Sequence, residues 1–155
     1  MKNINKWVLL LLFVCIALYS CRKEESYNEP ASTDMTKPDV VSNVKVQNFN
    51  GGATITYSLP NSKNILYVLA QYKINGVTTR ETKSSYYSDT ITVEGFAKKQ
   101  AYDVTLFTVS RANVKSDPLV VKVNPDTPPY LLVKPTINAQ ADFGGIKITG
   151  TNPSS

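Results

Sequence analysis

The chain has 155 residues, with 17 Lys and Arg, 12 Asp and Glu, no histidine and a formal net charge of +5. The lack of histidine excludes histidine-based catalytic triads, histidine metal sites and the usual zinc fingers. The lysines are scattered, with only Lys98 and Lys99 adjacent, so the sequence contains no basic stripe. We therefore do not expect nucleic acid as a partner. We expect neither a cofactor nor a bound metal ion.

Residues 1–20 have the organisation of a secretory signal peptide. Lys2 and Lys6 form a short basic region before an uncharged apolar run over residues 7–18, which is shorter than the roughly 20 residues that a membrane-spanning helix needs. The run ends in LYSC, which resembles the lipobox of bacterial lipoproteins. The resemblance implies cleavage before Cys21 and lipid on that cysteine. An ordinary free or buried thiol is the alternative.

Residues 21–39 are polar and include two prolines, so we expect a flexible tether with a reach of about 20–25 Å. The residues Lys23, Glu24 and Glu25 resemble the surface-export signal of Bacteroidota lipoproteins, with a solvated charged segment as the alternative. This implies a lipid-anchored protein of the outer membrane that faces the cell exterior, although a periplasmic orientation stays open.

Residues 40–125 alternate apolar and polar side chains, with turn residues about every ten positions, which is typical of a β-sandwich. Seven strands are expected at 41–46, 53–59, 65–73, 77–83, 90–93, 101–110 and 119–123. Asn75 and Gly76 give a strong hairpin signal between the third and fourth. No helical period follows residue 20. The sequence therefore predicts an all-β, immunoglobulin-like, seven-stranded sandwich.

The segment ITVEGFAKKQAYDVTLFTV resembles the E–F region of a fibronectin type III domain. Phe96 stands six residues before Tyr102, and the family's tyrosine packs across this corner while its hydroxyl bonds upstream backbone. The chain departs from the family at Tyr57, where a tryptophan is usual. The loop at Arg111 is not an Arg-Gly-Asp motif, so the resemblance implies no integrin binding.

One phrase occurs twice in the sequence. FNGGATITYSLP covers residues 49–60, and ADFGGIKITGTNP covers residues 141–153. Gly51 aligns with Gly144 at an offset of 93 residues, which is about one fibronectin-like domain plus a linker. We expect a linker at 126–129 and a truncated β-hairpin of a second such domain at 130–155. Two strands alone do not bury a face, so this hairpin should be weakly ordered or lean on the first domain.

The whole order of segments resembles the N-terminal part of Bacteroidota surface lipoproteins known only as a domain of unknown function. Those proteins continue into a second fibronectin-like domain and a discoidin-like domain, and they are associated with glycan acquisition. The resemblance implies a non-catalytic spacer or interaction module, with glycan or surface proteins of the same system as partners. A ligand-binding part would then lie beyond Ser155. The oligomeric state stays open.

Two tyrosines and one arginine are the candidate ligand contacts. Tyr86 and Tyr87 are adjacent, so that in a strand one ring would be exposed. This ring, or alternatively the loop at Arg111, could contact a carbohydrate or a protein. The alternative is one core tyrosine and one ordinary surface tyrosine. Asp89-Thr90-Ile91 resembles the O-glycosylation motif of Bacteroidota at Thr90.

The carboxylates give little support to an enzyme. Glu81, Asp89, Glu94 and Asp103 lie in separate predicted strands and turns, whereas a glycosidase needs two carboxylates about 5–10 Å apart across a cleft. We therefore expect no catalytic residue. A fragment of a polysaccharide-active enzyme is the remote alternative.

Overall fold

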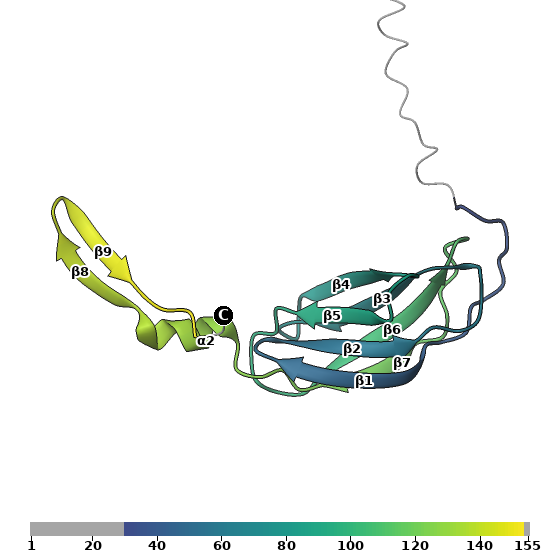
Figure 1. Ribbon diagram of the computed structural model, residues 1–155, viewed down its shortest axis with the longest axis horizontal. Helices are drawn as coiled ribbons and strands as arrows, with labels where there is room; N and C mark the ends of the chain where they lie inside the picture. The colour runs from purple at the N-terminus through teal and green to yellow at the C-terminus, as the bar shows by residue number, and fades with distance from the viewer. Residues whose placement is uncertain (1–29, 154–155) are drawn as a thin grey trace, which may run out of the picture. The chain divides into compact units, whose positions relative to one another are not determined.

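The computed structural model describes residues 30–153. Seven strands form two antiparallel sheets (Figure 1). The first has the order β1-β2-β5, made of β1 (Ser42–Phe49), β2 (Gly52–Ser58) and β5 (Thr90–Glu94). The second has the order β4-β3-β6-β7, made of β3 (Ile65–Lys73), β4 (Thr79–Ser85), β6 (Tyr102–Ser110) and β7 (Leu119–Val123). The predicted immunoglobulin-like sandwich is confirmed, and every expected strand is present.

The core lies between the two sheets, because alternate residues of each strand point to the same face. Ala53 and Ile55 on β2 and Val68 and Ala70 on β3 have no exposed surface. The buried cluster contains fourteen residues drawn from both sheets and the loops. Complete burial of one aliphatic side chain contributes about 1.5–3 kcal/mol, so this cluster is the main source of stability.

The chain enters and leaves the sandwich at opposite ends of β1. It enters at Ser42, where β1 begins. It leaves beside the other end, where Asp126 N–H donates to the Phe49 carbonyl at 3.0 Å and Gly51 N–H donates to the Asp126 carbonyl at 3.2 Å. Eight residues of extended strand span about 26 Å. The points where the chain enters and leaves the domain are therefore separated by roughly the length of β1.

A short helical segment follows the sandwich, although the sequence shows no helical period there. The segment consists of α2 (Pro129–Val133) and the 3-10 turn η2 (Lys134–Thr136). Pro129 occupies the first turn of α2, where its fixed φ suits a helix and its missing N–H costs nothing. Five residues are too few to produce a helical period in the sequence. Among residues 30–153, no helix is long and apolar enough to cross a membrane.

The predicted hairpin in the last part of the chain is confirmed. It consists of β8 (Asn138–Asp142) and β9 (Gly145–Thr149), which pair antiparallel. Every residue of both strands is exposed. The hairpin therefore forms without the buried face that supports the hairpins of the sandwich.

Candidate functional site

The structure brings the three candidate contact residues to one end of the sandwich. Arg111 N–H donates to the Asn64 carbonyl at 2.8 Å, and Tyr86 N–H donates to the Leu66 carbonyl at 3.2 Å. Both carbonyls lie at the start of β3. Since β4 and β6 flank β3 on either side, the tyrosine turn and the arginine loop are about 10 Å apart, or two strand spacings.

The two tyrosines lie in the turn after β4 and not in a strand, so the expected alternation does not apply to them. Their rings pack edge to face, with centroids 5.6 Å apart and an interplanar angle of 72°. Tyr86 is half-buried, whereas Tyr87 is 89% exposed. An edge-to-face aromatic pair is favourable by about 0.5–1.5 kcal/mol, so Tyr86 supports the orientation of the exposed ring.

The loop that carries Arg111 is held from inside by a serine. The buried Ser110 hydroxyl accepts the N–H groups of Ala112 at 3.2 Å and Val114 at 3.1 Å. Asn113 adopts a positive φ of 61°, a conformation in which asparagine is enriched. The half-buried arginine therefore projects from an ordered turn.

The last part of the expected tether contacts the same end of the domain. The Asn64 side-chain amide donates to the Asp34 carboxylate at 3.0 Å, and Lys37 forms an ion pair with Asp117. Thr36 hydrogen bonds, with a smaller contribution from Asn64, lower the pKa of Asp34. The described part of the segment at 21–39 is therefore attached to the domain in part, where the sequence predicted a free tether.

Thr90, the candidate glycosylation site, is the first residue of β5. Its hydroxyl donates to the Asp89 carboxylate at 2.9 Å, and its N–H donates to the Ser88 hydroxyl at 3.2 Å. The residue is half-buried. These bonds explain an aspartate at this position as a partner for the strand entry, while modification of Thr90 stays a prediction.

Tyr102 and Phe96 lie at the opposite end, at the corner between β5 and β6. The Tyr102 hydroxyl donates to the Lys98 carbonyl at 3.1 Å and accepts the Lys98 N–H at 3.2 Å. Its ring lies 4.4 Å from the ring of Phe96, which is 2% exposed. This is the arrangement that defines a tyrosine corner.

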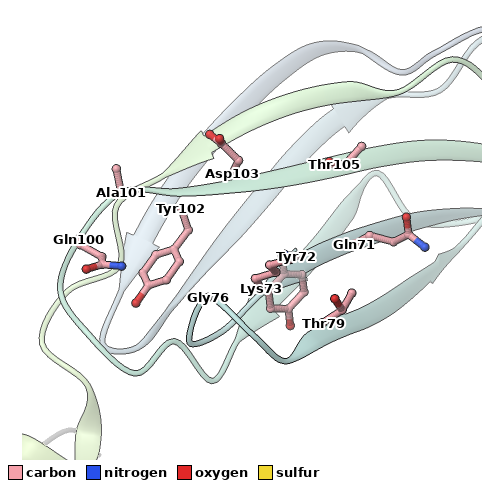
Figure 2. A pocket seen from close by; sticks show the side chains of 10 residues that line it. All are labelled: Gln71, Tyr72, Lys73, Gly76, Thr79, Gln100, Ala101, Tyr102, Asp103 and Thr105. Carbon is pink, nitrogen blue, oxygen red and sulfur yellow. The ribbon is translucent and has the colours of Figure 1, made fainter.

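A groove of about 450 Å³ lies beside this corner, and the sequence interpretation missed it. The pairing of β3 with β6 ends at Tyr72 and Val104, and the groove lies at this end of the paired strands. Figure 2 shows Asp103 and Thr105 along one side, and Gln71 and Thr79 along the other. The outward positions of β3 and β6 are polar here, which is the signal that could have suggested a polar groove. Its residues come from segments distant in sequence.

Two polar groups of the groove already have partners within the domain. Gln71 donates to the Glu81 carboxylate, and Asp103 pairs with Lys122 at 2.9 Å. The groove therefore offers acidic, basic and uncharged hydrogen-bonding side chains. It holds no unpartnered buried polar group that would identify a ligand.

The outer face of the four-stranded sheet carries two aromatic rings that lysines cover. Lys83 Nζ lies 4.9 Å from the Tyr67 ring centroid, and Lys115 Nζ lies 5.2 Å from that of Phe107. Cation–π contacts of this kind are worth about 0.5–1 kcal/mol at exposed sites. These rings are thus less available for stacking than Tyr87.

Tyr57 is a buried aromatic in the position where the sequence departs from the fibronectin pattern. It is 3% exposed, and its hydroxyl has no hydrogen-bond partner. The nearby Ser84 hydroxyl donates instead to the Thr90 carbonyl at 2.7 Å. Burial, more than the charge of Asp89, raises the pKa of Tyr57, and Ser84 opposes the rise. Tyr57 therefore fills the core at the cost of one unsatisfied hydroxyl.

No metal-binding cluster of three or more His, Cys, Asp or Glu occurs within residues 30–153. The predicted lipidation site Cys21 and export residues Lys23, Glu24 and Glu25 lie outside the described residues. The structure therefore does not bear on either prediction.

Two antiparallel sheets and a hydrogen-bonded tyrosine at the E–F corner define a fibronectin type III-like domain. Residues 38–125, more than half of the chain, match the family model described as "Domain of unknown function (DUF4959)", and the chain belongs to that family. A search of curated proteins finds no match.

Several solved structures are similar to part of this chain at low identity. The FN1–FN3 domains of chicken CNTN1 have a TM-score of 0.50 and 11% identity, covering 57% of this chain and 32% of that chain. The fibronectin type III domain of human fibronectin type III domain containing protein 3 has a TM-score of 0.47 and 14% identity, covering 64% and 95%. A β-1,2-glucanase from Parabacteroides distasonis has a TM-score of 0.49 and 13% identity, covering 63% and 14%. At its low identity, the first of these structures shows the fold alone.

Proposed function

We propose that the chain is a non-catalytic spacer of a lipid-anchored surface protein that serves glycan utilisation. The separation of the two connections by the length of β1 supports this role most directly. A module that receives the chain at Ser42 and releases it beside Asn50 holds its neighbours about 26 Å apart. The lipobox at Cys21 would place the protein at the membrane through its lipid.

The contacts at the exit make the spacer stiff in this proposal. Lys99 pairs with Asp126 at 3.3 Å, and the Tyr130 hydroxyl donates to the Ala97 carbonyl at 3.0 Å. The ring of Pro129 lies so close to Gly51 that an added Cβ would stand 2.9 Å from it. A connection held by backbone, ionic and ring contacts transmits the orientation of the domain to the residues that follow.

The spacer function is tested by replacing the domain in cells. Residues 40–125 are exchanged for an unrelated fibronectin type III domain, and surface exposure and glycan uptake are measured. Retained uptake supports a spacer, because only length and attachment are preserved. Lost uptake, with surface exposure intact, contradicts it and favours a specific binding surface.

The anchor is tested separately. Palmitate labelling should disappear in Cys21→Ala, and surface accessibility to protease should fall when Lys23, Glu24 and Glu25 are replaced by alanine. Labelling that persists without the cysteine would refute the anchor.

A second candidate function is carbohydrate or protein binding by the exposed tyrosine. The convergence of Tyr87 and Arg111 on one end of the sandwich favours it. An aromatic face with a nearby guanidinium suits a sugar ring or an acidic peptide. A glycan-array or pull-down signal that Tyr87→Ala removes and Tyr130→Ala retains supports binding. No signal from the folded protein contradicts it.

A further inference from the structure

The hairpin β8–β9 repeats the hairpin β1–β2 residue by residue. The five pairs from Lys45 with Thr56 to Phe49 with Gly52 become, after adding 93, the five pairs from Asn138 with Thr149 to Asp142 with Gly145. The turns also agree, since Gly51 has φ 72° and Gly144 has φ 74°. The repeated phrase in the sequence therefore marks a repeated structure with the same register.

One face of β8–β9 is apolar and uncovered. Ala139 lies opposite Ile148, and Ala141 lies opposite Ile146, so all four side chains share one face. Ile146 and Ile148 are 72% and 68% exposed, whereas their counterparts on β2, Ala53 and Ile55, are completely buried. The opposite face carries polar residues such as Gln140 and Lys147.

One edge of β9 is also unpaired within residues 30–153. Its counterpart β2 pairs with β1 on one side and with β5 on the other. The β5 pairs run antiparallel from Gly52 with Glu94 to Thr56 with Thr90. The edge of β9 that corresponds to the β5 side is the one without a partner. Exposed edges of this kind can accept another strand.

A glycine provides an independent indication of the same partner. A Cβ at Gly52 would lie 2.4 Å from the Phe49 ring and 2.8 Å from the Val93 carbonyl of β5, so no side chain fits there. A Cβ at Gly145 would meet nothing within 4 Å. The φ of Gly145 is not in the left-handed region, so neither its surroundings nor its backbone explains the glycine. A strand carbonyl in the place of the Val93 carbonyl would explain it.

We propose that β9 is an acceptor for an extended strand of the β5 type, which adds antiparallel along its free edge. The register of β5 on β2 sets the geometry. The partner residue opposite Ile148 corresponds to Ile91, and the residue opposite Ile146 corresponds to Val93. The occupant thus alternates polar and apolar residues, and its apolar side chains extend the face of Ile146 and Ile148. This inference does not depend on the proposed spacer function.

The experiment supplies such a strand to the full chain. A copy of residues 88–96 is fused behind Ser155 through a flexible Gly-Ser linker, because a short linker gives an effective concentration in the millimolar range. Hydrogen exchange of the β9 amides is measured by NMR. At least tenfold slower exchange at alternate residues between Gly145 and Thr149 is the expected result. Unchanged exchange overturns the proposal.

Two matched controls make the result specific. In the first, serine replaces the two positions of the fused strand that copy Ile91 and Val93, and the protection should be lost. In the second, Gly145→Val should leave the unfused chain unchanged and abolish the protection in the fusion, since its side chain takes the place of the incoming carbonyl. Protection that survives Gly145→Val overturns the register.

Self-association is distinguished by the unfused chain. Sedimentation velocity between 5 and 500 μM should show a monomer. The exchange rates of the β9 amides should not change over the same range of protein concentration. A concentration-dependent dimer with protected β9 amides would mean that a second copy is the occupant, and it would overturn the proposal of a β5-type strand.

Discussion

The Tyr102 hydroxyl lies 3.1 Å from the Lys98 carbonyl oxygen and 3.2 Å from the Lys98 nitrogen. One side chain thereby satisfies both backbone groups of a residue in the loop that joins the two sheets. Since Phe96 and Gly95 also donate N–H groups to the Gly51 carbonyl, this corner fixes the loop against the turn between β1 and β2. The corner therefore helps to hold the structure of the end of the domain from which the chain leaves.

Tyr102→Phe should destabilise the domain by about 1–2 kcal/mol, because it leaves the Lys98 groups without their partner. The free energy of unfolding, measured by urea denaturation, checks this. Tyr87→Phe is the control, since its ring is 89% exposed, and its effect should stay within about 0.5 kcal/mol. Equal effects of the two substitutions would contradict the role given to the corner.

Tyr57→Phe, unlike Tyr102→Phe, should not lower the stability of the domain. Its hydroxyl is buried without a partner, so removing the oxygen relieves an unsatisfied group and keeps the ring. We expect no loss of stability, or a gain of up to about 1 kcal/mol. A loss above about 1 kcal/mol in the same urea titration would show that the hydroxyl has a partner.

The alkaline limit of stability should also depend on Tyr57. Burial raises the pKa of this phenol above its ordinary value of 10.0, so the native state binds the proton more tightly than the unfolded state does. The stability from this group is fully present below pH 10 and is lost as the pH rises through the native pKa. Between pH 9 and 12, the melting temperature should fall less steeply with pH in Tyr57→Phe than in the unsubstituted protein. Identical slopes would rule out Tyr57 as the cause.

The contact between Asp34 and Asn64 should open in acid. Hydrogen bonds from Thr36 lower the pKa of Asp34 below its ordinary value of 3.8, so the attachment is present above that value and is lost as the pH falls through the native pKa. The NMR chemical shift of the Asn64 side-chain amide should change over this range. In Asp34→Ala, the same amide should already have at pH 7 the chemical shift that it reaches in acid in the unsubstituted protein. A signal that is insensitive to both would contradict the attachment.

Gly52→Val and Gly145→Val form a matched pair. The first places a side chain against the Phe49 ring and the Val93 carbonyl, so it should cost about 1–3 kcal/mol through overpacking. The second meets no neighbour and should not change the melting temperature of the sandwich. Comparable melting temperatures for both variants would contradict the packing described at Gly52.

The seven strands were predictable because their signal is local. A strand with one face in a core must alternate, and a turn such as Asn75-Gly76 leaves its own mark. Local rules were insufficient at two places. Pro129–Val133 is too short a helix to show a period, and the adjacency of Tyr86 and Tyr87 does not reveal that both lie in a turn and not in a strand.

The polar outward positions of β3 and β6 could have suggested a polar groove beside the corner, but its lining could not be predicted, because its residues come from separate segments. Gln71 on β3 and Thr105 on β6 become neighbours only when the sheet pairs. The convergence of Arg111 with Tyr86 at the start of β3 depends on the same pairing.

The sequence alone determined the class of fold, the positions of the strands and the repeat at an offset of 93, since each depends on periodicity or on self-similarity along the chain. The tertiary structure decided which residues meet and which faces are covered. Ile55 and Ile148 occupy equivalent positions in equivalent hairpins, yet one is completely buried and the other is 68% exposed. The difference arises because β2 has β5 and an opposing sheet beside it, whereas β9 pairs only with β8 within the described residues.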